Sequence, residues 1–217
     1  MLQSTMIMKQ IFFFFAIFCL LLTASCKRSS TVQDLPFAAD SVGNQVLVIT
    51  HSDSSFAQAA FYIHTPEGWQ LDCSGDAYVG KMGVGKMREG DARTPLGYLG
   101  ILSAFGIEPN PGTQIPYIDV TPTMVGVDGE GEYYNQIVDT AIVKVAVTGE
   151  NMHALVPEYN YGLTTTYNQA CVPGLGSCVF IHCKGSKPYT GGCVALDEEF
   201  MKHVLQVSDT TLTIYIR

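Results

Sequence analysis

The sequence predicts a single, mainly β domain with one or two short helices. The chain has 217 residues, of which 47% are hydrophobic, so it is long enough for one full core. Its 21 glycines and 10 prolines separate short β-branched runs, and helical periodicity is nearly absent. We therefore expect about eight strands joined by turns, without an internal repeat.

The first strands follow one another closely. Residues 45–50 and 59–64 are compact apolar runs, and residues 66–68 form a turn leading to a third strand at 69–73. Simple alternation would place Trp69, Leu71 and Cys73 on one face of that strand. A fourth strand is expected at 98–102, after a glycine-rich loop.

The second half alternates between loops and strands. Residues 105–134 are rich in proline, glycine and acids, which predicts loops with brief strands. Residues 141–148 are nearly all apolar and predict a strand buried on both faces, and residues 178–182 and 211–216 predict two more. Residues 197–207 have the helical apolar period, with Asp197 as N-cap and His203 on the solvated face.

Composition and motif spacing exclude several kinds of partner. The formal net charge is −8 and no basic run occurs, which argues against a nucleic-acid partner. The glycines of residues 79–98 lack the Gly-Lys-Ser/Thr ending and the βαβ context of a phosphate-binding loop. The acids of residues 128–132 lack a twelve-residue calcium loop. The sequence therefore predicts no cofactor and no metal.

The N-terminus reads as a targeting segment. Lys9 precedes an apolar run at 11–24 that is short for a membrane span and well sized for a signal peptide, and Met8 is a better start than Met1. Small residues before Cys26 resemble a bacterial lipobox, although Thr23 stands where leucine is usual; ordinary secretion is the alternative. We expect a lipoprotein signal peptide at 1–25, a tether at 26–43 and the functional domain at 44–217, on a membrane facing the periplasm.

Cleavage before Cys26 would remove Lys9 and no acid, so the net charge would change from −8 to −9. Cys19 would leave with the signal peptide, and Cys26 would carry the lipid. Five cysteines then remain in a compartment that favours disulfides, so one free thiol is expected. Without Cys193, the other four allow three pairings, which the sequence does not distinguish: Cys73, Cys171, Cys178 and Cys183.

The chemistry is concentrated in residues 180–196. An apolar run ends at His182, a polar loop follows, and Gly191 and Gly192 precede Cys193. A thiol nucleophile needs a base for its proton and amides around the attacked carbonyl, and the glycines allow a tight turn that supplies them. The pattern predicts Cys193 as nucleophile, His182 as base and Gly191-Gly192 as the oxyanion turn. Cys183 should point to the opposite strand face.

These residues stand in an ordered series with other motifs, which covers the chain from about residue 46 to its end. The series is Glu89-Gly90-Asp91, Thr94-Pro95, Gly97, Tyr134-Asn135, Tyr167-Asn168, Gly176-Ser177, Phe180, His182, Thr190 and Gly192-Cys193-Val194-Ala195-Leu196. In this order the motifs resemble the L,D-transpeptidase (YkuD-like) catalytic domain, in its secreted branch. The resemblance implies a β-sandwich-like fold and peptidoglycan stem peptides as substrate.

The resemblance also implies roles for individual residues. Cys193 would form a thioester with the stem peptide, with His182 as base and Thr190 in a supporting role. Lys81, Arg93, Tyr167 and Asn168 are assigned to substrate binding. Many relatives carry arginine where this chain has Ala195, so another cation should replace it; the further candidates are Lys86, Lys184 and Lys187.

Three alternatives stay open at this stage. The same cysteine could trim stem peptides by hydrolysis, as an L,D-carboxypeptidase. The chain could be a wall-binding lipoprotein without activity. Cys178, His182, Cys183 and Cys193 could form a zinc site, although the usual Cys-x-x-Cys spacing is absent.

Overall fold

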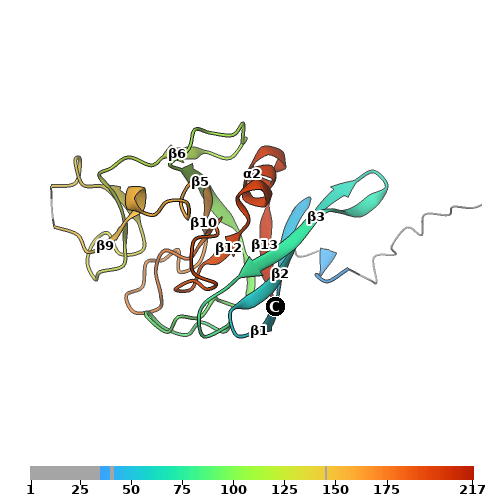
Figure 1. Ribbon diagram of the computed structural model, residues 1–217, viewed down its shortest axis with the longest axis horizontal. Helices are drawn as coiled ribbons and strands as arrows, with labels where there is room; N and C mark the ends of the chain where they lie inside the picture. Colours follow the sequence, from blue (N-terminus) through green and yellow to red (C-terminus); the bar gives the residue numbers. More distant parts are fainter. Residues whose placement is uncertain (1–34, 40–41, 145) are drawn as a thin grey trace, which may run out of the picture. The chain divides into compact units, whose positions relative to one another are not determined.

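The computed structural model describes residues 35–39, 42–144 and 146–217. These residues form a mainly β domain with a single α-helix, α2, and two sheets (Figure 1). The predicted fold class is confirmed, with thirteen strands in the described part of the chain where about eight were expected.

The large sheet contains ten strands and mixes parallel with antiparallel pairs. From edge to edge it runs β4 (Gly97–Leu99), β13 (Thr213–Ile216), β1 (Gln45–Asp53), β2 (Phe56–Thr65), β3 (Gly68–Tyr78), β12 (Val194–Leu196), β11 (Phe180–Cys183), β10 (Gly162–Thr165), β5 (Ile101–Gly106) and β6 (Tyr117–Asp119). The small sheet runs β8 (Ile137–Asp139), β7 (Met124–Val127) and β9 (Gly149–Asn151), and the 3-10 helix η3 (Met152–Ala154) follows it.

One core joins both ends of the large sheet. Leu99 of β4 and Leu163 of β10 belong to the same buried cluster as Leu47 and Ile49 of β1. Strands so far apart in the sheet order share a core only if the sheet curls over itself. This curling gives the domain its sandwich-like character.

The outer face of β1 carries a smaller cluster. Val46 and Val48 lie on this face, where Phe37 packs edge-on against Tyr62 and Trp69. Phe37 falls within the predicted tether at 26–43, so the described part of that tether is packed onto the sheet. The predicted signal peptide at 1–25 and Cys26 lie outside the described residues.

The predicted helix is confirmed as α2 (Glu198–Val207), which follows Asp197 and runs along one face of the large sheet (Figure 1). It buries Met201, Val204 and Leu205 in the main core. The Asp197 side chain does not cap the helix and pairs with Lys184 instead. In the described part of the chain, no helix has the length and apolar character needed to cross a membrane.

Two strand predictions were wrong. Residues 141–144 form a turn and an irregular segment in which Ile142 is 76% exposed, and β9 begins only at Gly149. The amides of Ile142 and Val143 donate to the Asp139 carbonyl, so a local turn prevails over the β-branched composition. The single strand expected at 98–102 is two strands, because the Gly100 amide and carbonyl bond Thr166 and separate β4 from β5.

The expected common face of Trp69, Leu71 and Cys73 was also wrong. Phe61 pairs with Cys73 and Tyr62 pairs with Leu71, so Asp72 is an extra residue in β3. Such a β-bulge reverses the alternation beyond it. Trp69 therefore packs in the outer cluster, and Cys73 packs against the main core.

The disulfides considered from the sequence do not form in the structure. All five described cysteines are free thiols: Cys73, Cys171, Cys178, Cys183 and Cys193.

Candidate active site

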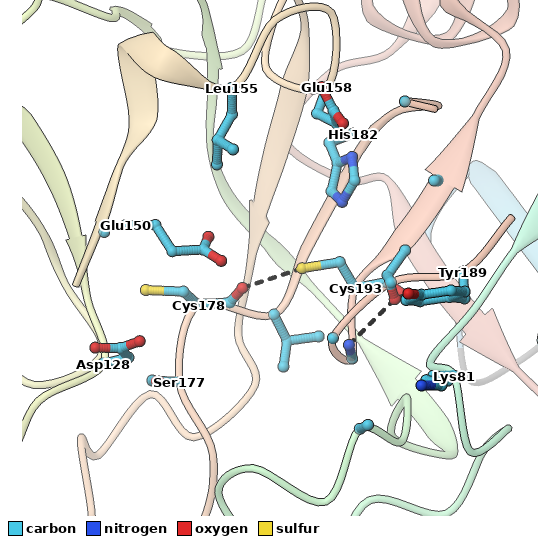
Figure 2. A pocket seen from close by; sticks show the side chains of 18 of the residues that line it. Lys81, Asp128, Glu150, Leu155, Glu158, Ser177, Cys178, His182, Tyr189 and Cys193 are labelled. Carbon is cyan, nitrogen blue, oxygen red and sulfur yellow. Dashed lines mark hydrogen bonds between the residues drawn. The ribbon is translucent and has the colours of Figure 1, made fainter. Parts of the chain in front are cut away.

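His182 and Cys193 lie on neighbouring parallel strands. Residue 181 pairs with 194 and residue 182 with 195, which places Cys193 beside Phe180 just before β12 begins. Alternation puts His182, Phe180 and Cys193 on one face of the sheet. The two candidates are thus offset by two residues, about 6.6 Å along the strands. Their side chains line the same cavity (Figure 2).

Cys183 takes the opposite face, as predicted. It is fully buried in the main core, and its thiol points to the Tyr161 carbonyl. A histidine that faces the cavity and a cysteine that faces the core therefore follow each other in β11.

The resting contacts of the two residues are separate. The Cys193 thiol donates to the Cys178 carbonyl over 3.2 Å and accepts from the Phe180 amide over 3.3 Å. His182 Nδ1 lies 2.7 Å from the Cys183 carbonyl. A carbonyl can only accept, so Nδ1 carries the proton and Nε2 keeps a free lone pair. This is the tautomer that a general base requires.

Burial keeps both groups neutral. It raises the pKa of Cys193 to about 12, although the Phe180 amide and the Lys86 charge act in the opposite direction. Burial also lowers the pKa of His182 below its usual value. The free protein therefore holds a neutral thiol and a neutral imidazole in the same cavity at pH 7.

The turn before Cys193 is fixed by two threonine hydroxyl groups. Thr190 Oγ1 and Thr94 Oγ1 both donate to the Cys193 carbonyl, over 2.7 and 3.0 Å. Thr94 in turn accepts from the Gly80 amide over 2.8 Å, deep in the structure. Both hydroxyl groups thus fix the backbone of Cys193 through its carbonyl.

Only glycine fits at position 192. Its φ is +154°, and an added Cβ would lie 3.0 Å from the Arg93 carbonyl oxygen. The Gly192 amide already donates to Thr190 Oγ1. Among the described residues, the amides of Gly191 and Cys193 have no acceptor. These two amides, and not that of Gly192, are the candidate donors for an oxyanion.

Lys86 is a cation that reaches this turn. Its ammonium group is almost fully buried and pairs with Asp91 over 3.1 Å. It also approaches within 3.4 Å of where a Gly192 Cβ would lie. Burial opposes ionisation of Asp91, but the amides of Met87, Arg88 and Arg93, together with Lys86, hold its pKa well below the usual range. Asp91 therefore holds the Lys86 ammonium in place, and this ammonium acts on Cys193.

Other motif residues fasten the surrounding loops to one another. Glu89 accepts from the hydroxyl groups of Tyr134 and Ser177, over 2.6 and 2.7 Å. Asn135 donates to the carbonyls of Tyr167 and Asn168 and accepts from the Cys178 amide. These hydrogen bonds position residue 178, whose carbonyl accepts the hydrogen bond from the Cys193 thiol.

The cavity has a volume of about 450 Å³ and contains charges of both signs. Asp128 and Glu150 lie on one side of Cys193, and Lys81 and Tyr189 lie on the other (Figure 2). Glu158 stands beside His182, and Tyr159 donates to Glu150 over 2.8 Å. A ligand with both an amine and a carboxylate would match this lining.

The residues assigned to substrate binding divide into two groups. Lys81 lines the cavity, and its ammonium lies 5.3 Å from the Tyr189 ring centre. The other three do not line it. Arg93 donates to the Val84 carbonyl, Tyr167 donates to the Leu175 carbonyl, and the Asn168 amide donates to the carbonyls of Val172 and Gly176. Their contacts within the described structure are those of loop residues.

The sequence did not single out Lys86, Glu150 or Glu158. Lys86 was one of several cations that could replace the missing arginine. Of the others, Lys184 pairs with Asp197, and Lys187 lies at the exposed rim of the cavity. Neither glutamate belongs to a motif with chemical meaning, so only the fold brings them to the cysteine.

The zinc alternative lacks a ligand set. The four side chains proposed for it do not converge, because Cys183 faces the core while Cys193 faces the cavity. In the described part of the chain, the three-residue group that could hold a metal is elsewhere, at Asp72, Cys73 and His203.

Comparisons with known proteins give a weak likeness of fold. No protein-family model matches the chain, and no curated protein matches it. Bd1075 of Bdellovibrio bacteriovorus is 13% identical over 82% of this chain and 49% of its own, with a TM-score of 0.44. The helical cell shape determining protein Pgp2 of Campylobacter jejuni is 19% identical over 80% of this chain and 47% of its own, with a TM-score of 0.42.

A single-residue variant of Pgp2 is 20% identical over 81% of this chain, also with a TM-score of 0.42. The chain spans about half the length of these solved structures. A likeness at this level carries no argument about function, which has to come from the site and the sequence motifs.

Proposed function

We propose that this protein is an L,D-transpeptidase-like cysteine acyltransferase that acts on peptidoglycan stem peptides. The observation that supports the proposal most strongly is the placement of His182 and Cys193 in one cavity. A buried, neutral His182 with a free Nε2 lone pair shares a cavity with the Cys193 thiol, on adjoining strands. The substrate class rests on the ordered sequence motifs, and the mixed charges of the cavity support it.

The first step is attack by Cys193 Sγ on the carbonyl carbon between the third, diamino-acid residue and the terminal D-alanine. Since the thiol is neutral at rest, its proton passes to His182 Nε2 as the carbon–sulfur bond forms. The thiol must first leave the Cys178 carbonyl and rotate towards the histidine. Such contacts are often made only in the complex with substrate.

The resulting oxyanion would accept from the amides of Gly191 and Cys193. One such donor typically contributes about 3 kcal/mol to transition-state stabilisation. Lys86 adds a positive charge at the same turn and is the candidate to replace the arginine that many relatives carry where this chain has Ala195. Protonation of the departing amine by His182 then releases D-alanine and leaves a thioester on Cys193.

The thioester is resolved by an acceptor whose proton again passes to His182 Nε2. An amine of a second stem peptide gives a crosslink, which is transpeptidation. Water gives a shortened peptide, which is L,D-carboxypeptidation. Asp128 and Glu150 provide a negative wall that would attract a cationic acceptor amine to the thioester, and this amine attacks once it has lost its extra proton to solvent. This wall favours the transferase over the hydrolase.

A lipid on Cys26 would hold the domain at a membrane facing the periplasm, within reach of the wall. This anchor is part of the proposal, and mass spectrometry of the mature N-terminus would test it. An unmodified, soluble N-terminus would indicate ordinary secretion instead.

Muropeptide profiling tests the activity. Cells that produce the wild type, Cys193→Ala or His182→Gln are compared at equal protein levels. New crosslinks between two diamino-acid residues, present only with the wild type, support the transpeptidase. Shortened stems alone indicate the carboxypeptidase. Identical profiles for all three proteins overturn the proposal and leave the wall-binding lipoprotein.

A further inference from the structure

A second group of reactive side chains lies between β3 and α2, away from the cavity. The carboxylate of Asp72, the thiol of Cys73 and the imidazole of His203 place their ligand atoms within 4.8 Å of one another. None of these residues lines the cavity around Cys193, and the proposed reaction uses none of them. His203 lies on the solvated side of its helix as expected, with its side chain 42% exposed, and its Nε2 lies 2.5 Å from Asp72 Oδ2.

The β-bulge in β3 creates this arrangement. Consecutive residues of a regular strand point to opposite faces, so Asp72 and Cys73 would normally be separated by the sheet. Because Asp72 is the extra residue of the bulge, it and Cys73 both reach the face on which α2 lies. Bulges commonly redirect a side chain in this way beside functional sites.

The helix holds the third side chain in place. Met201 and Val204, on either side of His203, are fully buried in the main core. One turn earlier, Phe200 packs beside Gly75 of β3 and against the same cluster as Cys73. The packing of α2 against the core therefore fixes the position of His203 beside β3.

The order of contacts does not suit a second nucleophile. In a cysteine–histidine–carboxylate triad the imidazole stands between the thiol and the acid. Here the carboxylate stands in the middle, because Asp72 interacts with both His203 and the Cys73 thiol. The three groups instead offer one sulfur, one nitrogen and one oxygen to a common point.

We propose that Asp72, Cys73 and His203 bind a divalent transition-metal ion, with Zn²⁺ as the best match. Zn²⁺ takes thiolate, imidazole and carboxylate ligands in tetrahedral geometry, and thiolate disfavours Mg²⁺ and Ca²⁺. The side chains of His203 and Asp72 are 42% and 31% exposed, so water can supply the fourth ligand.

The required adjustment is small. Zinc–ligand distances of about 2.0–2.3 Å place tetrahedral ligand atoms roughly 3.3–3.6 Å apart. The Nε2–Oδ2 distance must therefore increase by about 1 Å from its hydrogen-bonded value. The sulfur lies within 4.8 Å of both other atoms, so it must approach them by about 1.5 Å at most. Rotation of the two half-exposed side chains can provide this, while the backbone stays in place.

Cobalt titration of the purified full chain, stripped of metal with a chelator, tests the site. We expect one equivalent of Co²⁺ to give a thiolate-to-cobalt charge-transfer absorption, which Zn²⁺ then abolishes by displacement. Cys73→Ser should lose the absorption. His203→Gln should bind more than about 100-fold more weakly, since even partners outside the ligand set cost 10–100-fold.

Matched cysteine controls show which thiol is involved. Cys171→Ser and Cys193→Ser should both keep the absorption. Zn²⁺ should also raise the melting temperature of the wild type and leave that of His203→Gln unchanged, which provides a readout if Cys73→Ser does not fold. No absorption with the wild type, or absorption lost with Cys193→Ser and kept with Cys73→Ser, overturns the proposal.

Discussion

Replacing Gly192 by alanine should damage the site far more than replacing its neighbour Gly191. Position 192 has a φ of +154°, and the new Cβ would meet the Arg93 carbonyl oxygen at 3.0 Å. Strained backbone of this kind costs about 1–3 kcal/mol. At about 2–4 °C per kcal/mol for a domain of this size, the melting temperature should fall by about 2–12 °C.

In Gly192→Ala, the rate of acylation should fall by more than the loss of stability alone would cause. Relief of the contact displaces the turn that carries Cys193, and a displacement of even a fraction of an ångström should slow acylation roughly 10- to 100-fold. The assay is the rate at which a carbapenem, which resembles the acyl donor of the transpeptidase family, adds to the protein by intact mass. A melting curve of each variant accompanies it.

Gly191→Ala is the matched control. Gly191 has neither a positive φ nor any described atom within 4 Å of its Cβ position. This variant should melt within about 2 °C of the wild type, because an unstrained surface change is worth about 0.5 kcal/mol or less. Wild-type acylation by Gly192→Ala, or an equal loss in both variants, would refute the role given to this turn.

Three further predictions concern the groups around Cys193. Thr94→Val leaves the Gly80 amide without an acceptor and removes one of the two hydroxyl groups that donate to the Cys193 carbonyl, so the free energy of unfolding should fall by about 1–3 kcal/mol in denaturant titrations, whereas Thr94→Ser should keep most of it. Lys86→Met removes the fixed charge and should lower kcat about tenfold or more with little change in KM; a change in KM alone would instead indicate ground-state binding. Because burial lowers the pKa of His182, its neutral form persists in mild acid, and the acid limb of kcat/KM should have its midpoint below the usual value of about 6.5; a midpoint above it contradicts the assignment.

The sequence was most informative where burial follows a simple period. β2 and α2 could be predicted because one side of each element is apolar, and β1 because its first half is apolar on both faces. The same reasoning failed at residues 141–144 and 146–148, which join no strand, because the Asp139 carbonyl organises a turn there. Prediction from the apolar period failed again in β3, because nothing in the sequence pattern indicates that Asp72 is the extra residue of a bulge.

The site was predictable in its reacting residues and much less so in its supports. Alternation around His182 correctly placed Cys183 in the core. Glu150, Glu158 and Lys86 reach the cavity from segments far from Cys193 in the sequence, so their positions depend on the sheet order. The neutral state of the cysteine follows from burial, which the sequence does not reveal.

The proposed reaction depends on a thioester between Cys193 and a stem peptide. Intact-mass spectrometry of the protein mixed with a tetrapeptide stem, quenched at short times in acid, tests it most directly. We expect the mass to increase by the peptide acyl group without its terminal D-alanine, on Cys193, and we expect no increase with Cys193→Ala. An adduct that persists with Cys193→Ala, or no adduct while Cys193 remains a free thiol, would contradict it.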